Sequence, residues 1–330
     1  MKKKTIITLL ILVALLLLGA LGILTLLNSR TTNSEHVRIY LPEGSTYEAL
    51  CDSLSSANTD ALKQSRINAF NLFAHALKLD QHVRPGSYVI EPHMRQLTLV
   101  RKLRNGQQDP IRLTIGRFRT PDQLNDYLNA KLMHDDFHVT LDSFHIIRPD
   151  TYEFYWTVTP EAFMQRMQKE YNKVASSQWP VTSAGCGSQL TTFREAIILA
   201  SIVEEETNYN PEKPLIASVY LNRLAKGMPL QADPTVKYAV GDFTLRRILN
   251  KHLDVENPFN TYLHTGLPPA PICLPSKASI DAVLNAPESN YLYFCASEKM
   301  DGTHRFAVTL AEHNRNAAAF HRALSARGIR

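Results

Sequence analysis

The sequence has no strong excess of charge of either sign, and this absence limits its partners. Its 330 residues carry 36 Lys and Arg against 31 Asp and Glu, a formal net charge of +5. Lys2, Lys3 and Lys4 supply three of these charges at the start of the chain. The remainder is too small to form the basic face that binds nucleic acid, so we expect no nucleic acid partner.

Cysteine is scarce, and its spacing excludes two common kinds of site. The four cysteines are Cys51, Cys186, Cys273 and Cys295, and no pair has the C-x-x-C spacing of zinc or thioredoxin-like sites. We therefore predict no metal and no cofactor. Disulfides can form outside the cytoplasm, but sequence alone does not give their connectivity. Free buried thiols are the favoured interpretation.

The one long apolar run lacks a cleavage site. Thr5 to Leu27 is uninterrupted, and about 23 residues are enough to cross a bilayer as a helix. A cleaved signal peptide would have an apolar core of about 7–15 residues and a small-x-small exit, whereas residues 28–33 read NSRTTN. We predict an uncleaved single-pass anchor, with residues 1–4 as a cytoplasmic tail, because basic residues stay in the cytoplasm. The rest of the chain then lies outside.

Strands and helices alternate along the body of the chain, which predicts an α+β fold. Alternating apolar residues and turn signals predict strands at 37–41, 88–90 and 111–115, and helices at 45–54, 97–103 and 123–132. Later helices are expected at 160–174, 214–224 and 312–326, with a hairpin formed by 291–296 and 304–308. We assign residues 28–110 to a linker and a small βα subdomain, and residues 111–330 to a larger mixed domain.

Residues 133–190 are less regular. An aromatic-rich stretch at 148–156 is more typical of a core than of a platform for sugars. Residues 179–187 are expected to form a loop, and residues 227–235, rich in Pro and Gly, are expected to form another.

A helix that begins after Thr192 carries the clearest chemical signal. Thr192 and Glu195 form the S/T-x-x-E capping box, which satisfies the first backbone amides of a helix. An apolar run from Ala196 to Val203 follows, and then three consecutive glutamates at 204–206. Glutamates at a helix C-terminus oppose the helix dipole, so three in a row do not favour stability.

Helical phase separates the three carboxylates. At about 100° per residue, Glu206 lies over the apolar face formed by Leu199 and Ile202, whereas Glu204 lies nearly opposite. A carboxyl group on an apolar face loses solvation, so its pKa should rise. A glutamate that stays protonated near neutral pH can act as a general acid. A helix that simply ends in solvated acids is the alternative interpretation.

Seven short motifs occur in a characteristic order along the chain. They are PDTY at 149–152, ASIVEEET at 200–207, LQADPTV at 230–236, NTY at 260–262, GLPP at 266–269, YLYF at 291–294 and HRF at 304–306. In these motifs the sequence resembles the YceG-like family, the endolytic murein transglycosylases of the bacterial inner membrane. The resemblance implies an anchor helix, a LysM-like subdomain and a YceG-like catalytic domain. Ala270 and Leu274 depart from the family pattern, which bears on the shape of the binding groove.

The resemblance also implies a reaction and a catalytic residue. The family's essential glutamate corresponds to Glu206, the residue that helical phase places on the apolar face. It would cleave the MurNAc–GlcNAc β-1,4 bond within nascent peptidoglycan and leave 1,6-anhydro-MurNAc ends, thereby terminating glycan elongation. One glutamate is enough because the sugar's own 6-hydroxyl, rather than water, attacks.

Four further residues are candidates for substrate binding. Gln231, Asn260 and Tyr262 lie in loops rich in Pro, Gly and Asn, which present polar side chains from rigid turns. Each has a structural alternative: a backbone contact, a turn cap or a core position. Glu204 would either orient the site or face solvent. Asp233, which precedes a proline, is interpreted as shaping its turn.

Two readings without catalysis remain open. The chain could be a peptidoglycan-binding module, or a scaffold that holds cell-wall synthases at the membrane through its anchor. Peptidoglycan strands are the expected partner in every reading, and peptidoglycan synthases are a further candidate.

Overall fold

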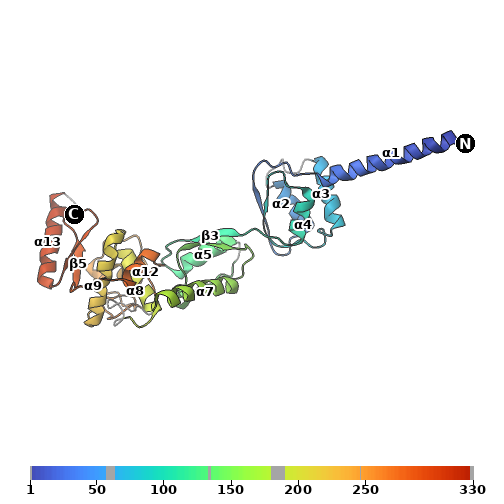
Figure 1. Cartoon of the computed structure of the whole chain (residues 1–330). Helices are drawn as coiled ribbons and strands as arrows, with labels where there is room; N and C mark the ends of the chain where they lie inside the picture. The colour runs from blue at the N-terminus through green and yellow to red at the C-terminus, as the bar shows by residue number, and fades with distance from the viewer. Residues whose placement is uncertain (1, 57–63, 133–134, 180–189, 246, 328–330) are drawn as a thin grey trace. The chain divides into compact units, whose positions relative to one another are not determined.

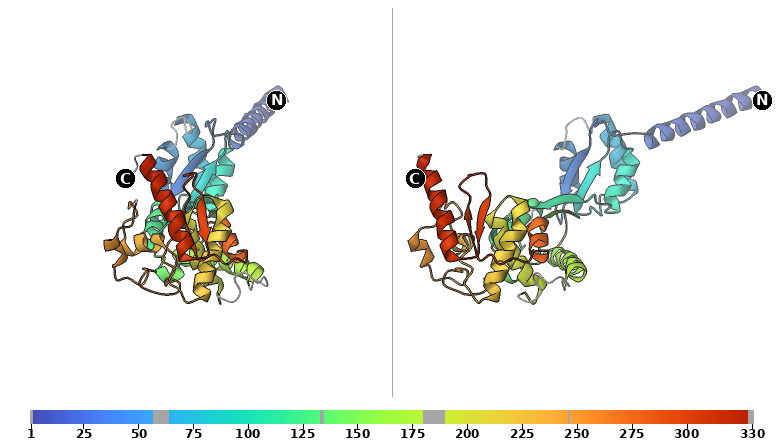
Figure 2. Two further views of the ribbon diagram at one scale, coloured as in Figure 1. Left: turned by 90° about the vertical axis from the view of Figure 1, so that its left-hand side faces the viewer. Right: turned by 60° about the vertical axis from the view of Figure 1, so that its left-hand side comes forward.

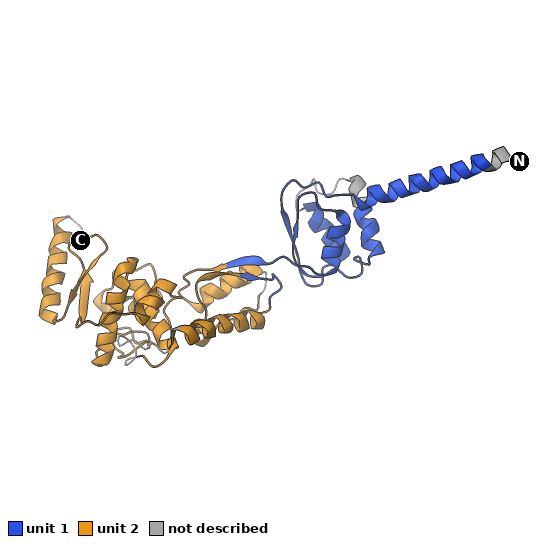
Figure 3. Ribbon diagram, viewed as in Figure 1, with its two compact units in different colours: residues 1–113, 153–158 blue, residues 114–152, 159–330 orange. Residues whose placement is uncertain are grey.

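The structure is a computed structural model that describes the chain except residues 1, 57–63, 133–134, 180–189, 246 and 328–330. The chain forms two compact units (Figure 3), residues 1–113 with 153–158, and residues 114–152 with 159–330. The predicted loop at 179–187 lies almost wholly outside the described residues, as does Cys186. The other three cysteines are free thiols, and Cys273 is buried.

The first unit begins with helix α1 (Lys2–Leu27), drawn in dark blue in Figure 1. Its segment Ile6–Leu27 has 22 residues and a mean hydropathy of 3.0, and no other part of the structure buries it. It is long and apolar enough to cross a membrane. A signal sequence near an N-terminus meets the same criteria.

A small two-stranded sheet organises the rest of the first unit. Strand β1 (Val37–Leu41) pairs antiparallel with β2 (Gly86–Ile90), and Val37 lies opposite Ile90. Helices α2 (Tyr47–Ser56), α3 (Gln64–Ala76) and α4 (Gln96–Arg104) complete it. The predicted strands and helices are confirmed here. The core includes Leu50, Phe70, Tyr88 and Leu99, each at most 1% exposed. The LysM-like label stays a prediction.

The chain passes between the units at three points, two of which lie in strands. Strands β3 (Ile111–Ile115) and β4 (Asp150–Phe154) pair with each other, and each contains a boundary between the units. Strand β4 lies in the stretch expected to be irregular. In the aromatic-rich stretch at 148–156, Phe154 and Trp156 are buried, whereas Tyr155 is 58% exposed. The interpretation of this stretch as part of a core is confirmed for Phe154 and Trp156.

The second unit is largely helical (Figures 1 and 2). Its helices are α5 (Pro121–Leu132), α6 (Leu141–Phe144), α7 (Pro160–Gln178), α8 (Phe193–Glu206), a 3-10 turn η1 (Asn210–Glu212), α9 (Lys213–Ala225), α10 (Asp233–Val240), α11 (Asn250–Leu253), α12 (Lys277–Leu284) and α13 (Leu310–Ala326). The predicted loop at 227–235 ends early, because Asp233 and Pro234 already form the first turn of α10. Proline suits that position, since its fixed φ matches the helix and its missing amide is not needed there.

Helix α8 is the central element of this unit. The Thr192 hydroxyl accepts from the Glu195 amide, and the Glu195 carboxylate accepts from the Thr192 amide, so the predicted capping box is confirmed. Every residue from Ala196 to Val203 is buried, and α8 packs against α9, α10 and α12. Ile197, on the side of the helix away from Glu206, is as buried as Ile202. The apolar face is therefore not restricted to one side, as helical phase alone suggested.

A hairpin and a helix close the second unit. Strands β5 (Tyr293–Ala296) and β6 (His304–Ala307) pair antiparallel, as predicted, with Phe294 opposite Phe306. Helix α13 packs along both strands (Figure 2). The hairpin and α13 thereby supply side chains to the cavities beside the end of α8.

Candidate active site

Glu206 is the last residue of α8, and its carboxyl group is held from the neighbouring helix. The Tyr220 hydroxyl of α9 donates to Oε1 of Glu206 at 2.5 Å. Burial raises the pKa of Glu206 to about 7, although the hydrogen bond from Tyr220 acts in the opposite direction. The negative charge of Asp233 raises this pKa further, and the positive charge of Lys237 lowers it. A carboxyl group in this state can donate a proton near neutral pH.

Two cavities meet at Glu206. The first, of about 350 Å³, is lined mainly by polar side chains, which include Tyr220, Arg223, Gln231, Asp233, Tyr262, Cys295, His304 and His313. The second, of about 690 Å³, has more apolar walls, which include Tyr209, Met300, Phe320 and Leu324. Glu206, Ala296 and His304 line both cavities. A chain-like ligand could therefore extend from Glu206 in two directions.

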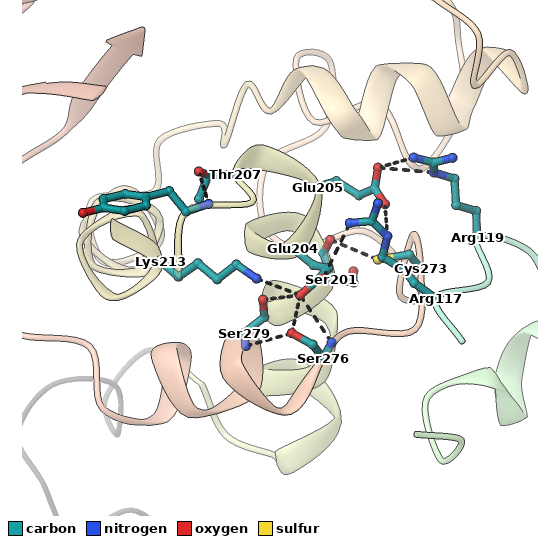
Figure 4. A network of polar contacts seen from close by, with 11 residues as sticks. Arg117, Arg119, Ser201, Glu204, Glu205, Thr207, Lys213, Cys273, Ser276 and Ser279 are labelled. Atoms are coloured by element: carbon teal, nitrogen blue, oxygen red, sulfur yellow. Dashed lines mark hydrogen bonds and ion pairs between the residues drawn. The ribbon is translucent and has the colours of Figure 1, made fainter. Parts of the chain in front are cut away.

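Glu204 lies in a buried network of polar contacts (Figure 4). Its Oε2 accepts from Lys213 Nζ at 3.1 Å, from Ser276 Oγ at 2.6 Å and from Ser279 Oγ at 2.5 Å. The side chains of Glu204 and Lys213 are only 11% and 4% exposed. Burial alone would raise the pKa of Glu204, but the hydrogen bonds from the two serines and Lys213 hold it below its usual value. Glu204 is therefore ionised.

Glu205 also pairs with cations. Arg119 Nη2 donates to Oε2 of Glu205 at 3.0 Å, and Arg117 Nε lies 3.6 Å from Oε1. Arg117 also reaches Oε1 of Glu204, at 3.5 Å (Figure 4). Both arginines come from the segment between β3 and α5. Among the three neighbouring glutamates, only Glu206 is left with a hydroxyl partner instead of a cation.

The predicted binding residues divide into two groups. Gln231 and Tyr262 line the polar cavity together with Glu206. Asn260 does not reach it, because its side chain is fully buried and its amide donates to the backbone oxygens of Leu253 and Val255 at 2.8 and 2.9 Å. Glu204 is also absent from the lining, since the network around Lys213 holds its carboxylate elsewhere. The hydrogen bonds of Asn260 connect it to its own loop, and those of Glu204 connect the end of α8 to Lys213 and to the start of α12.

Sequence reasoning missed three residues that the fold brings to Glu206. Tyr220 falls within the predicted helix at 214–224, Asp233 was interpreted as shaping a turn, and His304 was assigned to a strand. His304 Nδ1 lies 2.8 Å from Glu212, and this contact directs the rest of its ring toward the cavities. No spacing along the chain relates these residues to Glu206. Among the described residues, no group of three His, Cys, Asp or Glu is placed to hold a metal ion.

The sequence matches the model of the YceG-like family over residues 39–319. The chain belongs to the YceG-like family. Its relatives include a protein named endolytic murein transglycosylase from Bacillus subtilis, 35% identical over 196 residues, or 59% of this chain. A protein of the same name from Streptococcus pneumoniae is 26% identical over 340 aligned positions, or 89% of this chain. The matches span only 51% and 60% of those two relatives.

A solved family structure agrees with the fold. The crystal structure of a YceG-like protein from Listeria monocytogenes is 28% identical to this chain, with a TM-score of 0.52. The match covers 86% of this chain and 99% of the other. It supports the mixed helix and strand architecture of the family, as predicted from the sequence.

The buried network predicts a large loss of stability in Lys213→Met. This change removes the closest cation from the buried Glu204 carboxylate and leaves it only Arg117, at 3.5 Å, which should cost up to about 3–5 kcal/mol of unfolding free energy. Lys277→Met is the matched control, because Lys277 pairs with Asp281 on an exposed face of α12, where such pairs contribute about 0–1 kcal/mol. Urea unfolding measures both. Equal losses would show that the Glu204 pair behaves as a surface contact.

The raised pKa of Glu206 predicts that Glu206→Gln stabilises the protein at high pH. In the wild type, the folded state binds the proton more tightly than the unfolded state, so stability falls as pH rises from about 4.5 to about 7. The slope is about 1.4 kcal/mol per pH unit across this window. Glutamine does not titrate, so the unfolding free energy of the variant should rise relative to that of the wild type between pH 5 and pH 8.

Urea unfolding at pH 5 and pH 8 measures this gain. Glu161→Gln, on an exposed position of α7, controls for the loss of one negative charge. A Glu206→Gln advantage that is equal at both pH values would mean that the carboxyl group is not buried as described.

Proposed function

We propose that this protein is a lytic transglycosylase that cleaves the MurNAc–GlcNAc β-1,4 bond within peptidoglycan strands. The position of Glu206 carries the proposal: a carboxyl group with a pKa of about 7 lies where two cavities meet. The names of the Bacillus and Streptococcus relatives support the same reading. The products would be strands that end in 1,6-anhydro-MurNAc.

Glu206 acts in both halves of the reaction. As an acid, it gives its proton to the oxygen that bridges MurNAc and GlcNAc, and the bond from that oxygen to C1 of MurNAc breaks. As a carboxylate, it then takes the proton from the 6-hydroxyl of the same MurNAc, whose oxygen bonds to C1. Glu206 ends protonated, as it began, and no water is consumed. A pKa near the working pH suits a group that must give and take a proton in one cycle.

The two cavities support cleavage inside a strand rather than at its end. A strand bound in both would continue on either side of the bond above Glu206. Gln231 and Tyr262, in the polar cavity, are the proposed contacts for sugar hydroxyl and acetamido groups. The apolar walls around Phe320 would suit less polar parts of the strand. Cleavage within nascent strands would end their elongation.

The apolar helix α1 supports a location at the cell membrane. We propose an uncleaved, single-pass anchor in the inner membrane, with the catalytic unit outside the cytoplasm, where peptidoglycan lies. This location would also bring the protein near peptidoglycan synthases, which are proposed partners.

Glu206→Gln tests the reaction. Glutamine keeps the size of the side chain but delivers no proton, so the rate should fall by about 100-fold or more. Mass spectrometry of purified glycan strands digested by the wild type should find anhydro ends. Glu161→Gln is the control and should keep the wild-type rate. Reducing ends would instead identify a hydrolase, and intact strands that sediment with the wild-type protein would leave a binding module.

A topology experiment tests the location. Alkaline phosphatase fused after Arg330 should be active, because the anchor places the C-terminus outside the cytoplasm, and the mature protein should keep its first residues. N-terminal sequencing that begins near Ser29 would reveal a cleaved signal peptide and contradict the anchor.

A further inference from the structure

Asp233 is a second carboxylate in the polar cavity that holds Glu206. It is the first residue of α10, and its side chain lines the cavity. The Tyr262 hydroxyl donates to Oδ1 of Asp233 at 2.7 Å. A hydrogen bond from a phenol and a place in the first turn of a helix both favour a negative charge. The residue is also exposed, so a ligand in the cavity can reach it.

The charge of Asp233 is not neutralised within the described part of the chain. None of the lysines and arginines described there lies within ion-pair distance of its carboxylate. Glu204 and Glu205 differ in this respect, since each has a cation partner. Arg223 lines the same cavity, but its guanidinium donates to the backbone oxygens of Leu292, Pro229 and Leu230 and to Gln231. The negative charge of Asp233 is therefore available to a ligand.

The proposed reaction creates a positive charge that needs such a partner. In MurNAc the 6-hydroxyl lies on the same face of the ring as the bond that breaks. It cannot displace the leaving oxygen in line, so that bond must largely break before the new bond forms. Positive charge then develops on C1 and the ring oxygen, and the acetamido carbonyl of the same sugar can share it. Glycosidases stabilise such charge with a second carboxylate.

We propose that Asp233 is a second catalytic residue, which stabilises this positive charge without forming a bond to the sugar. The inference rests on the proposed function. Glu206 moves the proton, the 6-hydroxyl supplies the nucleophilic oxygen, and Asp233 contributes only its charge. Tyr262 positions the Asp233 carboxylate through their hydrogen bond. A bound strand excludes water from the cavity, which strengthens the interaction between the carboxylate and the cation.

Asp233→Asn keeps the shape of the side chain and removes the charge. The single-turnover rate of anhydro-end formation should fall by about 10- to 100-fold, with strand binding unchanged. The alkaline limb of the pH–rate profile should move to lower pH, because Asp233 raises the pKa of Glu206. Asp233→Glu should recover part of the rate. Asp254→Asn, an exposed position at the end of α11, is the matched control and should leave rate and limb unchanged.

Other charged and titratable groups around Glu206 determine what else can shift the alkaline limb of the pH–rate profile. They are Glu205 on α8, Arg223 on α9, Lys237 on α10, His304 on β6 and His313 on α13, together with the neutral phenols of Tyr220 and Tyr262. All are retained in Asp233→Asn, so a shift reports the lost carboxylate. Asp233→Ser, which also suits the first turn of a helix, gives a second neutral variant if Asp233→Asn melts below the assay temperature.

Several results would overturn the proposal. A rate within about twofold of the wild type in both neutral variants would show that the charge is not used. A loss of strand binding as large as the loss of rate would make Asp233 a binding residue only. A glycosyl azide formed by Asp233→Ala with azide would make it a nucleophile. Reducing ends from the wild type would reject the transglycosylase itself, which is a separate failure.

Discussion

The buried salt bridge between Glu204 and Lys213 is the interaction on which the arrangement of the site depends. Helix α8 ends in three carboxylates at a place where the helix dipole and the apolar surroundings both disfavour negative charge. Lys213, two serines of α12 and two arginines before α5 compensate the charges of Glu204 and Glu205. The helix end can then stay packed inside the unit while Glu206 faces a cavity. Without that compensation, three adjacent buried carboxylates would repel one another and favour exposure of the helix end.

Helix α9 provides a partner for both Glu204 and Glu206. Lys213 at its start holds Glu204 as a carboxylate, and Tyr220, two turns later, holds Glu206 through a hydroxyl. Ser276 and Ser279 add their hydroxyl hydrogen bonds to that of Lys213 and lower the pKa of Glu204, whereas the single hydroxyl of Tyr220 does not offset the burial of Glu206. Two glutamates two residues apart on α8 thus have pKa values displaced in opposite directions, one below its usual value and one to about 7. Because of this difference in pKa, Glu206 can hold a proton near neutral pH while Glu204 stays ionised.

The surroundings of Glu206 come from distant parts of the chain. Asp233 and Tyr262 approach from α10 and the loop before α12, His304 from the β5–β6 hairpin, and Phe320 from α13. The difference in polarity between the two cavities follows from this origin. The loops contribute amide, carboxylate and phenol groups, whereas one wall of the other cavity is the apolar side of α13. The packing of the hairpin and α13 against each other therefore determines the width and chemistry of one half of the proposed groove.

The sequence by itself determined the elements whose signals are local. The capping box at Thr192, the strands with alternating apolar residues and the apolar run at the N-terminus all depend on neighbours within a few residues, and the structure contains each of them. Helical phase also separated Glu206 from Glu204, and the two carboxyl groups have different partners in the structure. Phase could not show that Glu204 is also enclosed, because α8 is buried all round and the difference between the two lies in their partners: Lys213, Ser276 and Ser279 for Glu204, and Tyr220 for Glu206. Nor could it show that Asn260 supports a loop while Asp233 faces the cavity. Those outcomes depend on contacts between residues far apart in the chain, which only the tertiary structure brings together.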